Sequence, residues 1–315
     1  MATGCKHRRR IAPLLAGLII ALSVAATAAS PEVADFALEN PAPGVYVHYG
    51  QQAEMSRANR GDIANLGFVV GSRCVAVIDT GGTYAVGHAL REAIRDVTAA
   101  PICYVINTHG HPDHVFGNPA FAQDRPEFVG HVRLADALQR RGPNYFNALK
   151  RDLGDAADQS GIVPPTRSVA STDELDLGGR MLTLRAWKTA HTDNDLTVFD
   201  QTSGTLWLGD LLFVGHVPVV DGSLRGFLAA IDEIKTVRAS LAIPGHGRAL
   251  GWPEAIAPEE RYLKRLRDDV RAAIKAKRTL AETLGSGDAG CEQWLLCDQF
   301  QRRNVSAAYA ELEWE

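Results

Sequence analysis

The sequence predicts an α/β fold in which two sheets form a sandwich with helices on the outside. In the first part of the chain, short β-branched and apolar runs alternate with stretches of helical period, and a second strand-rich part follows. Both parts supply strands and helices of their own. The composition, 46% hydrophobic and 22% charged, is that of a globular protein. A length of 315 residues allows one large domain with an appendage, or two small domains.

Residues 1–28 are expected to form a secretory signal peptide. A basic segment from Lys6 to Arg10 precedes an uncharged apolar run from Ile11 to Ala26, and Ala26-Thr27-Ala28 fits a small-residue cleavage site. The run is short for a membrane span and contains Pro13, which disfavours the alternative of an uncleaved anchor. The paired arginines leave open the general secretory and the twin-arginine routes. We therefore expect a periplasmic protein with no membrane attachment after cleavage.

The charge of the mature chain argues against two classes of partner. Residues 1–28 hold four of the 33 Lys and Arg residues and none of the 37 Asp and Glu residues, so their removal changes the formal charge from −4 to −8. An acidic surface disfavours nucleic acid and anionic membranes. A small-molecule substrate is the expected partner.

Four cysteines remain after removal of the signal peptide. An even count in an oxidising compartment favours disulfides. Cys291 and Cys297 are close in sequence, and Cys74 and Cys103 each begin a strand-like run. These two pairs are the disulfide candidates, and four buried free thiols are the alternative.

The main domain is predicted to span residues 44–255, after a proline-rich lead over 29–43. Its first half contains one strand–helix–strand unit, whose second strand ends in a loop rich in histidine. In α/β proteins, functional sites usually lie at the carboxyl end of such a strand. The elements expected in this half are strands at 44–49 (an edge strand), 66–71, 74–79, 103–107 and 128–130, a helix at 85–97, and a helix at 133–153 interrupted at 142–145.

The second half of the main domain is again rich in strands, and residues 256–315 are predicted to form a helical extension. The extension contains no chemical motif, and we expect it to pack against the main domain. The elements expected here are strands at 181–187, 196–199, 205–208 and 241–243, and helices at 226–240, 258–284 and 305–312.

The loop after strand 103–107 is the strongest functional signal. His109, His111, Asp113 and His114 lie within six residues of a chain that has only 10 histidines. Nitrogen and oxygen ligands at the end of a rigid strand suit a divalent metal such as zinc. The alternative is a polar loop with fortuitous histidines.

Three further fragments place one polar residue each at a predicted strand end. They are His191 in Thr189–Asn194, Asp210 after Leu208, and His246 between two glycines. Glycine on both sides lets the backbone turn sharply toward a ligand. Each residue alone would be explained by hydrogen bonding in a core or turn. Their order, each at a strand end, predicts one composite site.

These residues together resemble the metallo-β-lactamase superfamily over about residues 44–250. The resemblance implies an αβ/βα four-layer sandwich and two zinc ions, with iron or manganese as alternatives. His109, His111 and His191 would hold the first ion. Asp113, His114 and His246 would hold the second, and Asp210 would bridge both. A water of lowered pKa would be the nucleophile, and Asp113 would accept and donate its proton.

Asp79 ends the strand beside the metal loop. We expect it to orient that loop without contacting the metals, and a purely structural turn is the alternative. His216, His131, Asn144 and Tyr145 are candidates for contacting substrate. A structural histidine is the alternative for His216.

Within the superfamily, the motifs resemble those of exported quinoprotein relay system zinc metallohydrolases, which are SoxH-like and related to glyoxalase II. The motifs are Thr108–Asn118 and Ala190–Leu196. The resemblance implies hydrolysis of a thioester, ester or lactone, and a periplasmic quinoprotein partner. Asp193-Asn194-Asp195 stands where thioesterase relatives carry a glycine, which argues against a glutathione thioester. Weak β-lactam hydrolysis and a non-catalytic zinc-binding role are the alternatives.

Overall fold

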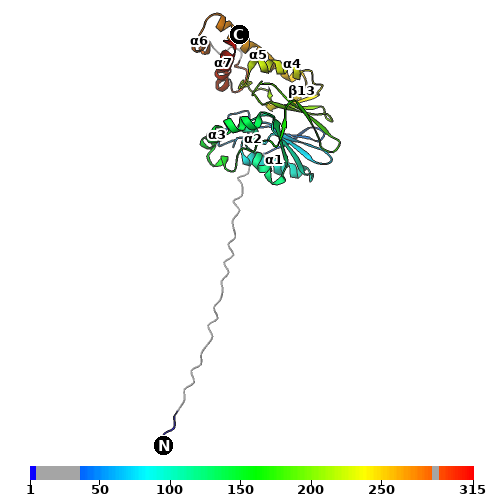
Figure 1. Ribbon diagram of the computed structural model, residues 1–315, viewed down its shortest axis with the longest axis vertical. Helices are drawn as coiled ribbons and strands as arrows, with labels where there is room; N and C mark the ends of the chain where they lie inside the picture. Colours follow the sequence, from blue (N-terminus) through cyan, green and yellow to red (C-terminus); the bar gives the residue numbers. More distant parts are fainter. Residues whose placement is uncertain (5–35, 286–290) are drawn as a thin grey trace. The chain divides into compact units, whose positions relative to one another are not determined.

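The computed structural model describes residues 1–4, 36–285 and 291–315, so the expected signal peptide lies almost entirely outside the described residues. The elements of the fold all belong to a compact unit spanning Pro31–Glu315. Within this unit two sheets lie between two groups of helices (Figure 1). Among the described residues, no helix is long and apolar enough to cross a membrane.

The first sheet has seven strands, and the carboxyl ends of its central parallel strands deliver the histidine loop. The strands β4 to β7 are parallel neighbours, whereas β1 to β4 pair antiparallel. The order is β1 (Glu39–Ala42), β2 (Val45–His48), β3 (Leu66–Val70), β4 (Val75–Ile78), β5 (Ile102–Ile106), β6 (Glu127–His131) and β7 (Arg167–Val169). The expected edge strand is therefore the second strand, because β1 pairs outside it.

The second sheet has six strands and supplies the other half of the site. Strands β11 and β12 pair in parallel, and the remaining pairs are antiparallel. The order is β13 (Leu250–Gly251), β12 (Leu241–His246), β11 (Thr205–Phe213), β10 (Leu196–Asp200), β9 (Met181–Ala186) and β8 (Thr172–Asp176).

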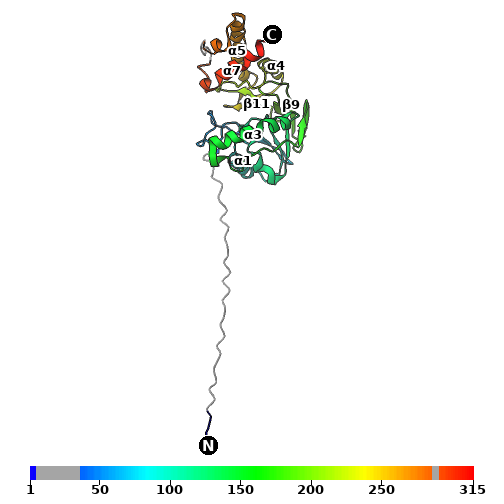
Figure 2. The same cartoon turned by 60° about the vertical axis from the view of Figure 1, so that its left-hand side comes forward.

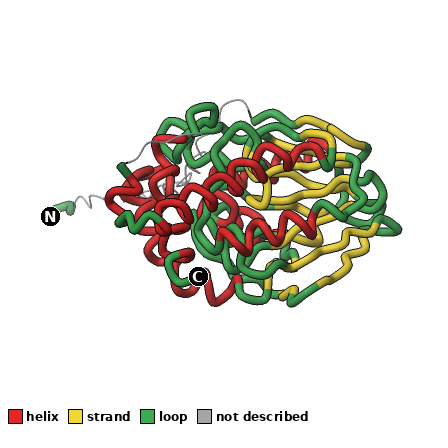
Figure 3. Tube along the Cα trace, turned by 90° about the horizontal axis from the view of Figure 1, so that it is seen from above, coloured by secondary structure: helices red, strands yellow, loops and turns green. Residues whose placement is uncertain are grey.

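Helices cover the outer face of each sheet, as two views of the ribbon show (Figures 1 and 2). The first group is α1 (Tyr84–Val97), α2 (Pro112–Val115) and α3 (Leu134–Leu153). The second group is α4 (Leu224–Ile234), α5 (Ala257–Lys275), α6 (Leu280–Leu284) and α7 (Cys297–Leu312). Seen from the side of the second group, these helices cross over the strands (Figure 3). The four-layer sandwich is thus confirmed.

The apolar core is divided in the same way. One cluster joins residues of both sheets, such as Val47 and Ile106 from the first and Leu184 and Val198 from the second. A second cluster lies between the first sheet and α1, and a third between the second sheet and α4, α5 and α7. The C-terminal helices therefore share the core of the second sheet.

Four helical predictions need correction. The helix expected over 226–240 ends at Ile234. The helix expected to break at 142–145 is continuous through Pro143. Leu138 before this proline, and Leu149 and Leu153 after it, share an apolar cluster with α2. The long helix expected over 258–284 is two helices, because Lys277 has a positive φ and Thr279 caps a new helix. The last helix begins at Cys297, eight residues before the predicted Val305.

Two disulfides are present among the described residues. Cys74 and Cys103 join the segments of β4 and β5, and Cys291 joins Cys297 at the start of α7.

Candidate metal centre

The loop that follows β5 is held rigidly by buried amides. Asn118 donates to Asn107 at 2.8 Å, Asn107 donates back at 3.1 Å, and the Thr80 hydroxyl donates to Asn118 at 2.8 Å. Within this frame lie His109, His111 and the short helix α2, which carries Asp113 and His114. The loop thus presents four of the predicted ligands from one fixed backbone.

The other three predicted ligands come from the second sheet. His191 lies in the turn after β9 and His246 ends β12. Asp210 lies inside β11, which continues to Phe213 and so is longer than the predicted strand. A Cβ at Gly245 would lie 1.9 Å from Oδ1 of Asp210, so only glycine allows β12 to pass so close to this carboxylate.

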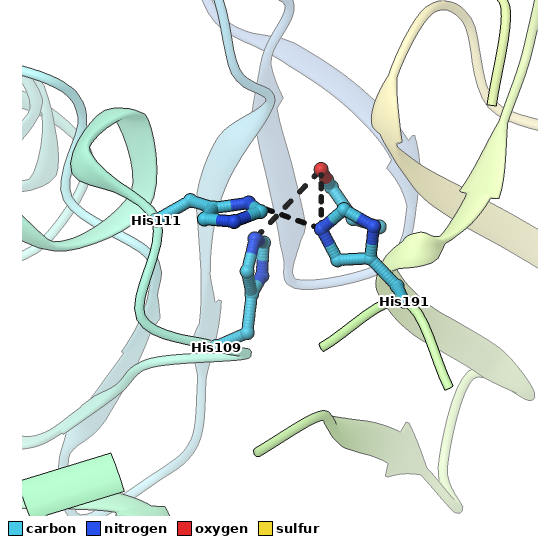
Figure 4. A group of neighbouring side chains, drawn as sticks. His109, His111 and His191 are labelled. Carbon is cyan, nitrogen blue, oxygen red and sulfur yellow. Dashed lines mark hydrogen bonds and ion pairs between the residues drawn. The ribbon is translucent and has the colours of Figure 1, made fainter. Parts of the chain in front are cut away.

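The first group of side chains is formed by the three histidines His109, His111 and His191, which point toward one another (Figure 4), and by Asp210. Nε2 of His191 lies 3.1 Å from Nδ1 of His111. Oδ2 of Asp210 lies 3.3 Å from Nε2 of His191 and 3.7 Å from Nε2 of His109. All four ligand atoms lie within 4.8 Å of one another.

The second group consists of Asp113, His114 and His246, again with Asp210 beside it. Oδ2 of Asp113 lies 3.5 Å from Nε2 of His114 and 3.4 Å from Nε2 of His246. Oδ1 of Asp210 lies 3.2 Å and 3.5 Å from the same two nitrogens. One oxygen of Asp210 therefore faces each group.

The nitrogen on the far side of each ring is fixed by a hydrogen bond. Nδ1 of His114 contacts Asp79 at 2.8 Å, and Nδ1 of His191 and of His246 contact the carbonyls of Val219 and Ile63 at 2.7 and 2.9 Å. Such contacts orient each ring and, in its neutral form, place the proton on the outward nitrogen. Asp79 also accepts hydrogen bonds from the amide and hydroxyl of Thr108, and it thus touches the loop at three points.

The inward atoms form a donor set that fits divalent metals. Nε2 of His109, Nε2 of His114 and Oδ1 of Asp210 are buried and have no hydrogen-bond partner among the described residues. Buried polar atoms without partners are costly and rare, and they call for an ion or a water. Imidazole nitrogens with carboxylate oxygens suit zinc and other first-row metals. The geometry therefore brings the seven predicted ligands together as two adjoining groups.

Burial and the shared carboxylate set the charges of these side chains. Burial lowers the pKa of His191 to about 4 and that of His109 well below its ordinary value. Burial alone would lower the pKa of His246, but the carboxylates of Asp210 and Asp113 outweigh this effect and raise the pKa of His246 to about 9. For Asp210, burial is outweighed by His246 and His114, which hold its pKa well below the usual range. The carboxylate of Asp210 is thus ionised.

A cavity of about 270 Å³ opens onto the ligands. Of the four residues expected to contact substrate, Tyr145 and His216 line it, whereas His131 and Asn144 are not among its lining residues. Both ring nitrogens of His131 contact backbone groups, at Trp187 and Arg133, and Asn144 is exposed on α3. The ring of His216 stacks on that of His246 and lies tilted beside Phe300, and its Nδ1 lies 2.6 Å from the Val217 carbonyl.

Three residues near the predicted ligands could not have been assigned to the site from the sequence. Asp221 lies 3.3 Å from Nε2 of His111 and fixes that ring. Phe300 and Arg303 reach the cavity from α7. They follow no motif, and only the packing of α7 on the second sheet brings them to the site.

Comparisons with known proteins agree with this fold. The model of the metallo-beta-lactamase superfamily matches residues 59–246, more than half of the chain. A solved structure described as TMB-1 is 17% identical, with a TM-score of 0.57, and the match covers 73% of this chain and 97% of that one. A metallo-beta-lactamase from Pontibacter korlensis is also 17% identical, with a TM-score of 0.57 and coverage of 72% and 98%. A comparison with curated proteins finds no match.

The fold and the two ligand groups define a metal-dependent hydrolase. The chain belongs to the metallo-beta-lactamase superfamily.

Proposed function

We propose that the protein is a binuclear zinc hydrolase that acts on a carbonyl-type substrate such as a thioester, an ester or a lactone. The observation that carries this proposal is the position of Asp210, whose two oxygens face the two ligand groups at 3.2–3.7 Å. His109, His111 and His191 would hold one ion, and Asp113, His114 and His246 the other. When bound, the ions supply Lewis acidity and a water whose pKa is lowered to about 7.

The side chains of the centre contribute orientation and proton transfer. Asp79, Val219 and Ile63 fix the rings, so that no reorganisation is needed on substrate binding. Asp113 lines the cavity and its carboxylate faces both histidines of the second group, where it can take a proton from the attacking water and pass it on. Phe213, Val219 and Phe300 give the cavity apolar walls that limit its water.

His114→Ala tests the centre. It removes a ligand atom of the second group, so we expect loss of about one metal per chain and a fall in kcat of at least about 100-fold, the lower end of a catalytic-group effect. Metal content is measured by elemental analysis after loading with zinc, iron or manganese. His88→Ala is the matched control, because His88 lies on α1 beside Tyr84, outside both groups. Unchanged metal content and rate in His114→Ala would refute the proposal.

The substrate class requires a panel. Thioester, ester, lactone, β-lactam and phosphodiester compounds are offered to the zinc-loaded protein with and without a chelator. We expect chelator-sensitive turnover of one of the first three. Strongest turnover of the β-lactam would favour the alternative of a weak β-lactamase. Bound metal without hydrolysis of any compound would favour a non-catalytic accessory protein.

We further propose that the chain is exported to the periplasm and serves a quinoprotein pathway. The basic and apolar pattern of residues 1–28 supports export, and so do the two disulfides, because disulfides persist in oxidising compartments. The motif resemblance supports the pathway. N-terminal sequencing of the mature protein from a periplasmic fraction is expected to begin near Ala29, and an intact N-terminus would exclude cleavage.

A further inference from the structure

The loop at residues 217–223, here called the support loop, lies against the turn that carries His191. The amide of Asp221 donates to the His191 carbonyl at 3.0 Å, and the Val219 carbonyl lies 2.7 Å from Nδ1 of His191. A carboxylate oxygen of Asp221 lies 3.3 Å from Nε2 of His111. Two of the three histidines of the first group are therefore held from outside by this one loop.

Asn304, on α7, holds the support loop from the other side. Asn304 is fully buried. Its Oδ1 accepts a hydrogen bond from the Val220 amide at 2.9 Å. Its Nδ2 donates to the Pro218 carbonyl at 2.6 Å and to the Tyr262 hydroxyl at 2.8 Å. The oxygen and both N–H groups of this side-chain amide are thus used. A buried polar group with all its partners in place fixes one arrangement of the backbone around it.

A single peptide group joins Asn304 to His191. The carbonyl of Val219 and the amide of Val220 belong to the same peptide group, which is planar and trans, so they point in opposite directions. The amide end donates to Oδ1 of Asn304, and the carbonyl end contacts Nδ1 of His191. Because the group is rigid, turning it would break both hydrogen bonds together. The orientation of the His191 ring is therefore linked to a side chain on α7.

The histidines of the second group are held by other parts of the chain. Nδ1 of His114 contacts Asp79, and Nδ1 of His246 contacts the Ile63 carbonyl. Both of these partners precede α1 in the sequence and belong neither to α7 nor to the support loop. The two groups therefore differ in their dependence on the C-terminal helix.

A second buried asparagine offers a comparison beside the second group. Asn65 donates to the carbonyls of Pro244 and Gly247 at 2.8 and 2.7 Å, on either side of the glycine–histidine pair that brings His246 to the centre. Asn65 and Asn304 thus both hold backbone next to a predicted ligand, one for each group.

We propose that Asn304 is a positioning residue for the metal of the first group, and that it acts on His191 through the peptide group between Val219 and Val220. Without its side chain, the Val220 amide and the Pro218 carbonyl would be buried without these partners, which is costly, so the support loop would shift. Such a shift turns the carbonyl that holds Nδ1 of His191, whereas the second group keeps its own contacts. This inference rests on the proposed function and assigns to α7 the support of one half of the centre.

The zinc affinity of each group, measured separately, tests the proposal. Two backgrounds isolate the groups in the full chain: His114→Ala leaves the first group complete, and His111→Ala leaves the second complete. In the His114→Ala background, Asn304→Ala is expected to weaken zinc binding about 10–100-fold, the range for loss of a contact that supports a ligand. In the His111→Ala background it should leave the affinity unchanged. Competition with a chromophoric chelator measures both affinities.

Asn65→Ala is the matched control, and the opposite pattern is expected: weaker zinc binding in the His111→Ala background alone. Asn304→Asp is the milder variant, because it keeps an acceptor for the Val220 amide. It should lose less affinity than Asn304→Ala, again only in the His114→Ala background. A general loss of stability would weaken both groups alike. Equal losses in the two backgrounds, or no loss in either, would therefore overturn the proposal.

A measurement without metal separates failure of this inference from failure of the proposed function. Nitrogen NMR of the zinc-free protein reports which ring nitrogen of His191 carries the proton. We expect Nδ1 to carry it in the wild type and in Asn65→Ala, and the two tautomers to be mixed in Asn304→Ala. That result supports the inference even if the protein hydrolyses no substrate. An unchanged His191 tautomer in Asn304→Ala would overturn it, whether or not the zinc-loaded protein is active.

Discussion

Asp79 controls the histidine loop through one carboxylate in an unusual backbone position. Its φ of 54° lies in the left-handed region that L residues rarely adopt, and its oxygens contact Thr108 and His114. Strained residues of this kind persist where the surrounding structure fixes them, often at functional sites. The contact between Asp79 and His114 explains how Asp79 can orient the loop. The carboxylate of Asp79 accepts a hydrogen bond from Nδ1 of His114 and so holds the ring in place.

Asp79→Asn is predicted to weaken metal binding. An amide that turned its nitrogen toward Nδ1 of His114 would force the other tautomer and place a proton on Nε2, the inward atom. We expect zinc affinity to fall about 10–100-fold, the range for loss of such a supporting contact. Competition with a chromophoric chelator measures it. Asp124→Asn, which alters the ion pair with Arg91 on α1, is the control. Equal affinity of the Asp79 variant and the wild type would contradict this role.

At the scale of single residues, the ligands could be read from the sequence and the cavity wall could not. His109 to His114 are local, and His191, Asp210 and His246 stand beside turns that glycine or polar residues mark. Phe300 and Arg303 sit on an amphipathic helix where an aromatic and an arginine are ordinary surface residues. Their importance arises only when α7 packs beside β11, which is a tertiary contact without a local pattern.

Among the elements, β4 and β5 have the most direct influence on the centre. The first leads into Asp79 and the second into the histidine loop, and the disulfide Cys74–Cys103 joins them at their other ends. The parallel pairing of these strands could be predicted from the strand–helix–strand order. The course of α3 through Pro143 could not, because tertiary packing of Leu138 and Leu149 overrides the local helix-breaking signal.

Removal of the two disulfides is predicted to have unequal effects on stability. Cys74 and Cys103 are separated by 29 positions, and Cys291 and Cys297 by 6. The chain-entropy model gives a loss of about 3–4 kcal/mol for the longer loop and about 2 kcal/mol for the shorter. Urea unfolding of the two paired Cys→Ala variants measures both, each serving as control for the other. A larger loss for the Cys291/Cys297 variant would contradict the prediction.

On the scale of the whole molecule, the two halves of the chain meet through a core between the sheets, and the extension adds a core outside the second sheet. Within that outer region Glu259, on α5, is fully buried. Burial raises the pKa of Glu259 well above its ordinary value, and the backbone amide of Phe213 offsets this effect only in part. A buried carboxyl of this kind makes the stability of the fold depend on pH.

The contribution of Glu259 to the stability of the fold is predicted to fall as pH rises above about 4.3, the unfolded pKa of glutamate. The folded state holds the Glu259 proton to higher pH than the unfolded state does, so the favourable contribution is complete below that pKa and is lost toward the folded pKa. Glu259→Gln removes this loss, so its advantage over the wild type should grow between pH 5 and pH 8 in urea unfolding. The exposed Glu254→Gln is the control. An advantage independent of pH would show that Glu259 does not titrate in this range.

The position of α7 also bears on how such an enzyme can diverge. The ligands come from the loop after β5 and from the turns and strands of the second sheet, whereas Phe300 and Arg303 come from a segment beyond residue 296. In the proposed hydrolase, the residues that would hold the metals and this part of the cavity wall are therefore encoded in separate stretches of the gene. Exchange or mutation of the last segment could redirect the enzyme to new compounds while the metal ligands stay untouched, so selectivity can evolve without passing through an inactive ancestor.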